Sequence, residues 1–543
     1  MKKILLLVTT FNSLSQAVYV WLRDRGYDVG VVFAMDLKRD EYVQAFMPDV
    51  ILSPFLKHYI PPKIYERYPT FVFHPGIRGD RGAYSLDYAL LDGVREWGGV
   101  WLRADELYDG GDIYASGVFE MPYRYKASIY RQEMLNVAVG SLDELFSNIS
   151  TLTSTPQILN PLHTPLNQEL RGIDWDRDSC DEIIRKVYAS DSHPGVLDEI
   201  CGVKCYLFGI HKEDRLRGKP KEILAKRDGA ICLGTVDGAV WISHLKEPNS
   251  FKLPATYLLK DKIQGIKEHR LPLIWDRSYD TFYEVSVDIV DEVGYLYFNF
   301  HNGAMSTAQC IRLKYAIEYL KEQVKVLVLM GGEDFFSNGI HLNILEDSKK
   351  QGEDGWANIN AINDVISSII YADEVVTVAS FGKNAGAGGV FLGLACDFVV
   401  AKEGVVLNPH YKTLGLTGSE YHTYTLPKRV GKSLSQKLLD ECMPISANYA
   451  HKIGMVDKLL ESDRYMTNLH EYVKELYDDD FLWDKQEYLL DNKEMIESHK
   501  ERELEIMYPE FWEEDSLFHK LRYEFVYKVC AVGTPERFLA FSV

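Results

Sequence analysis

Alternating runs of hydrophobic and mixed positions at the start of the chain predict a β-α-β order. An apolar run at 3–10 is followed by a helical pattern over 17–25 and a second apolar run at 29–34. Shorter β-like runs at 50–52 and 70–74 continue the alternation. Strands that alternate with helices form a parallel sheet with crossover helices. We therefore expect an α/β domain with a parallel sheet at the N-terminus.

The pattern changes in the middle of the chain. Pro156, Pro161 and Pro165 interrupt the sequence and indicate a linker or domain boundary. Short strand-like runs with turn signals follow between 200 and 245, and Asp237-Gly238 is typical of a hairpin turn. This stretch favours a small β-barrel over a second α/β layer.

An α/β rhythm returns after residue 276. Residues 294–300 alternate, 308–320 are helical, and 324–330 form the apolar run of a buried strand. In this helix we expect one apolar face, made of Ile311, Tyr315, Tyr319 and Leu320. From about residue 464 the tail is helical and rich in charged and aromatic residues.

Four domains are predicted from these changes, and together they make an α/β multidomain protein. They cover residues 1–160 (α/β), 161–275 (β-barrel), 276–465 (α/β) and 466–543 (helical extension).

Composition and charge narrow the possible functions. A hydrophobic fraction of 46% is that of a packed globular protein, and a net charge of −20 argues against non-specific nucleic-acid binding. Within 202–272 basic residues outnumber acidic ones; this region could face a polyanion, but we interpret it as a solvated surface. No run reaches the ~20 apolar residues of a membrane helix, and no signal peptide is recognisable. Scattered cysteines indicate reduced thiols in the cytoplasm and no metal site.

Two clusters in the first domain carry candidate chemistry. One is Phe73-His74-Pro75-Gly76, and the other is the acidic, glycine-rich stretch 105–112. Each alone is typical of an ordinary strand end or turn. A histidine and an aspartate that meet beyond the carboxyl edge of a parallel sheet could, however, stabilise an oxyanion and move a proton.

In this order and spacing the two clusters resemble the folate-dependent formyltransferases. The resemblance implies that His74 and Asp109 are catalytic and that Asp105, Gly110 and Gly111 lie in a folate-contacting loop. It also places Val72 at the position of the family's asparagine, which binds the formyl oxygen. Residues 171–175 and 183–185 resemble the C-terminal module of methionyl-tRNA formyltransferase, so the resemblance extends to about residue 250 and implies a Rossmann-like domain followed by an OB-like barrel.

Glycine-rich turns in the third domain resemble the crotonase (enoyl-CoA hydratase/isomerase) superfamily. The turns are 302–306, 336–342 and 384–389, followed by 394–397. Backbone amides at such turns can hold a developing oxyanion. The resemblance implies that the amides of Ile340 and Gly388 form the oxyanion hole for a thioester carbonyl. It further implies coenzyme A contacts at Asn338, Gly339 and Leu342.

Departures from the crotonase pattern argue against water addition. Phe391 occupies the position of one of the two glutamates that a hydratase uses, and His410 or Tyr411 occupies the position of the other. His341 occupies the position where the family usually has an aspartate. Tyr411 and Glu420 are then the candidate catalytic side chains, and His422 and Tyr424 are further polar candidates near the expected pocket.

The combination of both halves resembles the HypX/HoxX-type hydrogenase maturation factors, whose Gly-Leu-x-Gly-Ser-Glu-Tyr segment matches residues 415–421. The resemblance implies formyl transfer from 10-formyltetrahydrofolate to coenzyme A, release of carbon monoxide for [NiFe]-hydrogenase, and possible contacts with other maturation proteins. Three alternatives remain: formylation of a tRNA or amino sugar, hydrolysis of formyl-folate, and a non-enzymatic scaffold.

Overall fold

The protein consists of two compact units, and one is inserted in the chain of the other. We describe residues 2–275, 277–529 and 531–539 of a computed structural model. The first unit contains residues 1–269, 278–282 and 530–543, and the second contains residues 270–277 and 283–529. The first unit is therefore completed only by the C-terminal end of the chain.

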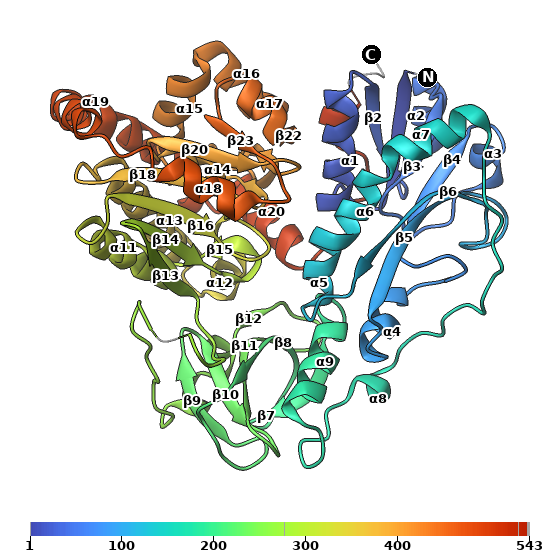
Figure 1. The fold of residues 1–543 in the computed structure, drawn as a ribbon, viewed down its shortest axis with the longest axis horizontal. Coiled ribbons are helices and arrows are strands. Elements are labelled where there is room, and N and C mark those ends of the chain that lie inside the picture. The colour runs from blue at the N-terminus through green and yellow to red at the C-terminus, as the bar shows by residue number, and fades with distance from the viewer. Residues whose placement is uncertain (1, 276, 530, 540–543) are drawn as a thin grey trace. The chain divides into compact units, whose positions relative to one another are not determined.

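A six-stranded sheet in the order β2-β1-β3-β4-β5-β6 forms the centre of the first unit (Figure 1). The strands β1 to β4 are parallel, and β5 and β6 add antiparallel pairs. Residues Ile4–Val8 of β1 are almost completely buried, as in a parallel strand covered on both faces. The strands are β1 (Lys3–Val8), β2 (Asp28–Phe33), β3 (Val50–Ser53), β4 (Thr70–His74), β5 (Glu96–Arg103) and β6 (Ile113–Glu120).

Helix α1 (Ser13–Asp24) connects β1 to β2 and confirms the predicted β-α-β order. It begins at the N-cap Asn12, whose side chain accepts a hydrogen bond from the backbone amide of Ser15. On the same unit, α6 (Leu135–Gly140) packs on α1 and on strands β5 and β6. The helices therefore cover the sheet and leave the carboxyl ends of its parallel strands to the loops.

A second, antiparallel sheet in the order β7-β8-β11-β10-β9 follows. It contains the predicted hairpin, closed by the Thr235 amide bonded to the Gly238 carbonyl at 3.0 Å. Helix α9 (Cys180–Ser190) begins with a capping box of Ser179 and Glu182 and packs on this sheet. The strands are β7 (Val196–Ile200), β8 (Val203–Glu213), β9 (Ile223–Arg227), β10 (Ala230–Gly234) and β11 (Ala239–Lys246).

A buried ion cluster joins this module to the first sheet's helices. Asp87 of α4 (Ser85–Leu91) lies 2.9 Å from Lys126 Nζ and 2.6 Å from the guanidinium of Arg171. All three side chains are at least nine-tenths buried. Because each charge is compensated at close range, the cluster fixes how the helices pack together.

The last part of the chain packs on the first unit. The amide of Phe33, at the end of β2, donates to Thr534 Oγ1 at 3.0 Å. Phe538 is buried, and its ring lies 4.8 Å from that of Phe11 and 6.0 Å from that of Phe33. We call residues 531–539 the C-terminal segment.

The second unit has its own six-stranded sheet, in the order β13-β14-β16-β18-β20-β23. Only the first pair is antiparallel. The central strands β16 and β18 are buried along their whole length, as the apolar run at 324–330 predicts. The strands are β13 (Val285–Val290), β14 (Val293–Phe298), β16 (Val326–Gly331), β18 (Val376–Phe381), β20 (Phe398–Lys402) and β23 (Lys458–Leu460).

The predicted helix after β14 is present as α11 (Thr307–Lys321), but the prediction of its apolar face is wrong. Ile311, Tyr315 and Tyr319 are exposed, and only Leu320 of the four is buried. The buried hydrophobic face instead consists of Cys310, Leu313, Ala316, Ile317 and Leu320, which also recur at helical spacing. Helix α11 packs on α13 (Gln351–Ile370), and Ile311, Tyr315 and Tyr319 are left on the outer side.

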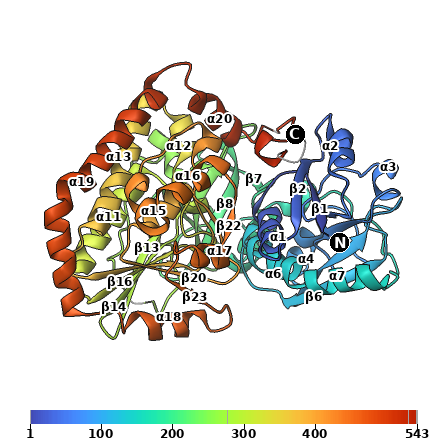
Figure 2. The same cartoon turned by 90° about the horizontal axis from the view of Figure 1, so that it is seen from above.

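The predicted helical tail contains α18 (Tyr465–Val473), the long α19 (Asp479–Trp512) and α20 (Leu517–Val526). Helices α11, α13 and α19 lie side by side (Figure 2). The buried positions Leu482, Leu489, Ile496 and Glu503 of α19 recur every seven residues. In the described part of the chain, no helix is both long enough and apolar enough to cross a membrane.

Candidate functional site

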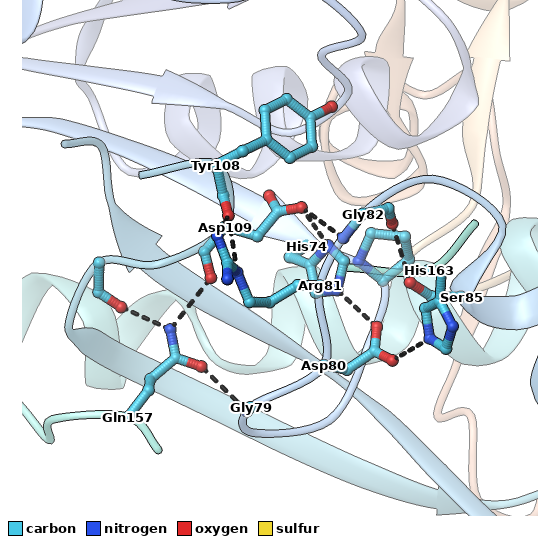
Figure 3. Close-up of polar contacts among 12 residues, drawn as sticks. His74, Gly79, Asp80, Arg81, Gly82, Ser85, Tyr108, Asp109, Gln157 and His163 are labelled. Carbon is cyan, nitrogen blue, oxygen red and sulfur yellow. Dashed lines mark hydrogen bonds and ion pairs between the residues drawn. The ribbon is translucent and has the colours of Figure 1, made fainter. Parts of the chain in front are cut away.

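His74 is the last residue of β4 and is almost completely buried. Its Nδ1 lies 3.5 Å from the Asp109 carboxylate, and its Nε2 lies 2.8 Å from the Asp80 carboxylate (Figure 3). Both ring nitrogens thus face a carboxylate oxygen. The two residues singled out by the formyltransferase resemblance therefore lie together, at the carboxyl end of a parallel strand.

Asp80 was not assigned a role from the sequence. It lies six residues after His74, and its second oxygen accepts a hydrogen bond from His163 at 2.6 Å. Burial raises the pKa of the Asp80 carboxyl, but hydrogen bonds from His74, Ser85 and His163 outweigh this effect and leave the pKa below its ordinary value. A side chain at Gly76 would come within 2.2 Å of Asp80 and 2.5 Å of the His74 ring, so this turn requires glycine.

The acidic loop presents Asp109 from the other side. Asp109 has a φ of 52°, and its carboxylate accepts a hydrogen bond from the Gly82 amide at 2.9 Å. Gln157, from the proline-containing segment, bonds to the backbone of both loops, at Gly79 and Gly111. The segment predicted as a linker therefore contributes both Gln157 and His163 to the walls of this site (Figure 3).

Val72 shares the His74 face of β4, because side chains two residues apart on a strand point the same way. It is partly buried against the apolar cluster of Val100, Leu102 and Ile113. Its side chain has no polar atom, so it can contact a folate only through apolar surface. The remaining loop residues Asp105 and Gly110 make local turn contacts: Asp105 accepts from the Leu107 amide, and the Gly110 amide donates to the Leu107 carbonyl.

A second cluster of candidate residues lies in the second unit. Ile340 ends the short strand β17 (Gly339–Ile340), and Gly388 begins helix α14 (Gly388–Leu394). A side chain at Gly339 would lie 3.2 Å from the Gly388 amide nitrogen, and one at Gly388 would lie 2.2 Å from Glu420 Oε1. The predicted oxyanion-hole segments are thus neighbours, and the Glu420 carboxylate lies directly against one of them.

Glu420 occupies an unusual position. It and Tyr421 have φ values of 62° and 52°, so two successive non-glycine residues adopt the left-handed region. The Glu420 amide donates to the Asn363 side chain, which fixes the turn to α13. Burial raises the pKa of Glu420 to about 7, despite hydrogen bonds from Tyr411 and the Ser419 amide that lower it.

Tyr411 is fully buried beside Glu420. Its ring stacks on Phe391 at 5.2 Å, and its hydroxyl donates to the Ser419 carbonyl at 3.2 Å. His422 packs edge-on against both rings. Phe391, predicted to stand at the position of a hydratase glutamate, packs against the tyrosine.

Three further sequence candidates have mainly local contacts. Asn338 donates its side-chain amide to the Asn302 carbonyl, and Leu342 is buried at the start of α12 (Leu342–Asp347). Tyr424 bonds to Tyr488 of α19 at 3.3 Å. The structure does not assign any of them a direct chemical role.

Several functional candidates could not be assigned from the sequence. Asp80 belongs to the glycine-rich stretch after His74, but the sequence does not show that it contacts the imidazole. His163 belongs to a segment that we interpreted as a linker. Glu503 of α19 lies behind Glu420 and His422, and its Oε1 is 3.3 Å from His422 Nδ1. The only signal for Glu503 in the sequence is a charged residue at the seven-residue spacing of Leu482, Leu489 and Ile496.

Comparisons with known proteins agree with this two-part arrangement. Residues 165–262 match the formyl transferase C-terminal domain, and residues 298–486 match the enoyl-CoA hydratase/isomerase family. The chain is 36% identical to the hydrogenase maturation factor HoxX of Bradyrhizobium diazoefficiens, over 98% of this chain and 96% of that protein.

A solved structure gives the same result for the whole fold. HypX from Aquifex aeolicus, crystallised with tetrahydrofolic acid, has a TM-score of 0.96 and 41% sequence identity, and the match covers 99% of this chain and 98% of that one. The predicted fold class is thereby confirmed: an α/β multidomain protein with a Rossmann-like formyltransferase domain, a small OB-like β-barrel and a crotonase domain with a helical tail. Because these relatives match it over nearly its whole length, the chain belongs to the HypX/HoxX family of hydrogenase maturation factors.

Proposed function

We propose that this protein transfers the formyl group of 10-formyltetrahydrofolate to coenzyme A in its first unit and decarbonylates formyl-CoA in its second. The carbon monoxide released would be the ligand that [NiFe]-hydrogenase maturation requires. The observation that carries the proposal is the pairing of His74 with Asp109 on one side and of Glu420 with the Gly388 segment on the other. Family membership and the tetrahydrofolic acid in the Aquifex aeolicus structure support the choice of donor.

In the first step the thiol sulfur of coenzyme A attacks the formyl carbon. The new C–S bond forms, the C–N10 bond breaks, and the thiol proton ends on N10 of tetrahydrofolate. His74 stabilises the oxyanion of the tetrahedral intermediate, and Asp109 orients the imidazole and helps to move the proton. Since Val72 offers no hydrogen-bond donor, the imidazole has to supply the polar contact to the formyl oxygen. Nε2 is engaged by Asp80 at 2.8 Å, so Nδ1, whose contact with Asp109 is long at 3.5 Å, is the nitrogen that would face the oxygen.

In the second step the thioester carbonyl binds at the amides of Ile340 and Gly388. Glu420 removes the formyl proton, the C–H electron pair stays on carbon, and the C–S bond breaks to give carbon monoxide and a thiolate. Tyr411, beside Glu420, passes the proton to the departing sulfur. A carboxyl with a pKa of about 7 is well suited to act as base near neutral pH.

The deciding experiment supplies 10-formyltetrahydrofolate with and without coenzyme A and traps carbon monoxide with reduced haem. We expect folate consumption and carbon monoxide release to depend on coenzyme A. Tyr411→Phe and Glu420→Gln should still consume formyl-folate but yield less carbon monoxide, because both side chains belong to the second step.

Other outcomes would identify another function. Formate release without coenzyme A would indicate a hydrolase. Consumption only with a tRNA or an amino sugar would indicate a different acceptor, and no consumption under any condition would indicate a scaffold. Carbon monoxide release that was indifferent to coenzyme A and to changes at Gly388 would refute the two-step proposal.

A further inference from the structure

Helix α19 contacts the turn that carries Glu420 through carboxylates. Glu497 accepts a hydrogen bond from the Tyr421 hydroxyl at 3.0 Å, Glu503 accepts from the Thr423 amide at 2.7 Å, and Glu510 accepts from the Thr417 amide at 3.1 Å. All three glutamates follow residue 486, where the match to the enoyl-CoA hydratase/isomerase family ends. The helical extension is therefore attached to the candidate site at three points.

Glu503 differs from the other two in its burial. Its side chain is 2% exposed, whereas those of Glu497 and Glu510 are more accessible. It stands in the buried seven-residue series of α19, where its neighbours are Leu482, Leu489 and Ile496. A carboxyl at such a position is costly to bury, so an apolar residue would favour folding.

The contacts of Glu503 lead directly to the catalytic turn. Its Oε1 accepts from the amide and hydroxyl of Thr423, at 2.7 and 2.5 Å, and lies 3.3 Å from His422 Nδ1. Its Oε2 is buried and has no hydrogen-bond partner among the described residues. His422 Nδ1 is also 2.9 Å from the Ser419 carbonyl, so it links Glu503 to the peptide that precedes Glu420.

We propose that Glu503 is a positioning residue of the second active site, which in its neutral form holds the strained turn of Glu420 and on ionisation places a second negative charge behind it. The inference rests on the proposed decarbonylation. Glu503 does not touch the substrate in this account. It acts through His422 and Thr423 on the residue that does.

Electrostatics are consistent with this role. Burial, together with the charge of Glu420, raises the pKa of Glu503 to about 8, although hydrogen bonds from Thr423 lower it. Burial lowers the pKa of His422 to about 4, so this ring is neutral at pH 7 and provides no compensating charge. The other titratable groups that interact with Glu503 are Glu420 and Tyr421 on the turn and Tyr411 before it, and His499 of α19 shares the Thr423 hydroxyl. Tyr371 and Lys500 contact the neighbouring Glu497.

The rate of decarbonylation should depend on pH through the ionisation of Glu420 and of Glu503. Glu420 must be ionised to accept the formyl proton, so decarbonylation rises as pH passes about 7. Glu503 ionises above about 8, and a second carboxylate opposes the negative charge that develops on sulfur. The rate should therefore fall above pH 8, by about ten-fold at pH 9 for a single ionisation.

The test supplies formyl-CoA directly and measures carbon monoxide release between pH 6 and 9. Glu503→Gln keeps an oxygen for Thr423 but cannot ionise, so we expect it to keep the rise near pH 7 and lose the fall above pH 8. Glu503→Leu removes the anchor, and we expect about a ten-fold or larger loss in kcat at pH 7. Thr423 is exposed, so in this variant water can satisfy its amide and hydroxyl, but water does not hold the turn in place.

The controls separate this inference from folding and from the proposed function. Glu505→Gln, on the exposed side of α19, should match wild type throughout. Thermal unfolding of Glu503→Leu should be no lower than that of wild type, because leucine completes the apolar series. An unchanged pH profile in Glu503→Gln, or full activity in Glu503→Leu, would overturn the inference. Absence of carbon monoxide from the wild-type protein at every pH would instead overturn the proposed decarbonylation, and this inference with it.

Discussion

At the scale of single residues, the first site has an apolar residue, Val72, where the formyltransferase resemblance places a hydrogen-bond donor, and it has a second carboxylate, Asp80, beside His74. Val72 has no polar atom to offer a formyl oxygen, and His74 is held at both nitrogens, by Asp109 and Asp80. Asp80 in turn accepts from His163. The 2.8 Å bond from Nε2 to Asp80 fixes the ring, and the longer 3.5 Å contact of Nδ1 with Asp109 leaves that nitrogen as the one that would face the proposed oxyanion.

Replacement of His74 or Asp109 by alanine should lower formyl transfer by about 10²-fold or more, as expected for a positioned acid or base. The measurement is the rate of 10-formyltetrahydrofolate consumption with coenzyme A present. Asp143→Ala provides the matched control, because that carboxylate is largely exposed on the same unit. Consumption at the wild-type rate in both variants would show that the chemistry takes place elsewhere.

The sequence was sufficient to predict that His74 and Asp109 lie together, because each stands in a short motif with a fixed spacing. Their catalytic role remains a prediction. The sequence was not sufficient for His163 or Gln157, because their segment has no periodic pattern and its path over the site depends on tertiary contacts. The spacing of Asp80 from His74 was visible, but only the fold shows that the turn closes back onto the imidazole.

At the scale of elements, helix α14 determines what the second site cannot do. The crotonase resemblance places Phe391, one turn into this helix, at the position of a hydratase glutamate, and its ring stacks on Tyr411. The same resemblance places the oxyanion-hole amides at Ile340 and Gly388. On this prediction the second site binds a thioester carbonyl and lacks one of the two acids that add water.

We therefore expect no measurable hydration of crotonyl-CoA. The assay follows loss of the conjugated double bond by ultraviolet absorbance, beside an authentic enoyl-CoA hydratase as positive control. Robust turnover would mean that Phe391 does not correspond to the hydratase glutamate.

The sequence predicted the order of strands and helices correctly, but it did not predict which face of α11 is buried. The order of strands and helices follows from periodicity, and the structure has it in both units. The apolar face of α11 was wrong because Ile311, Tyr315 and Tyr319 also recur at helical spacing. The face that is buried in the structure contains Cys310, Leu313, Ala316 and Ile317, and helical spacing alone does not decide between two such faces.

At the scale of the whole molecule, the second unit is an insertion in the chain of the first. The chain passes between the two units four times, after residues 269, 277, 282 and 529, so the site around His74 and the site around Glu420 belong to covalently connected units. The four-part domain division made from the sequence remains a prediction. Linear reading of the chain could not show that residues 531–539 pack with β2, because no pattern marks a contact across 501 residues.

This arrangement predicts a local effect of changes at the C-terminal end. Phe538→Ala should cost the first unit ~3 kcal/mol of stability or more, since it removes a buried aromatic ring. Hydrogen exchange should become faster in β2 and remain unchanged in β16 of the second unit. Val532→Ala, at a position that is 73% exposed, is the control. Faster exchange in β16 but not in β2 would contradict this account.

The contact between Phe33 and Thr534 also has a consequence for synthesis of the protein. β2 is an edge strand, and the residue that caps its last amide leaves the ribosome 501 residues later. At ~5–20 residues per second this is a delay of roughly 25–100 s. The first unit is therefore the last to be completed. The edge of β2 lacks its contact with Thr534 while the inserted unit is synthesised. A chain that ended at residue 529 would contain a complete second unit and an incomplete first unit. We expect such a truncated chain to expose the edge of β2 and to be degraded faster than the full-length protein.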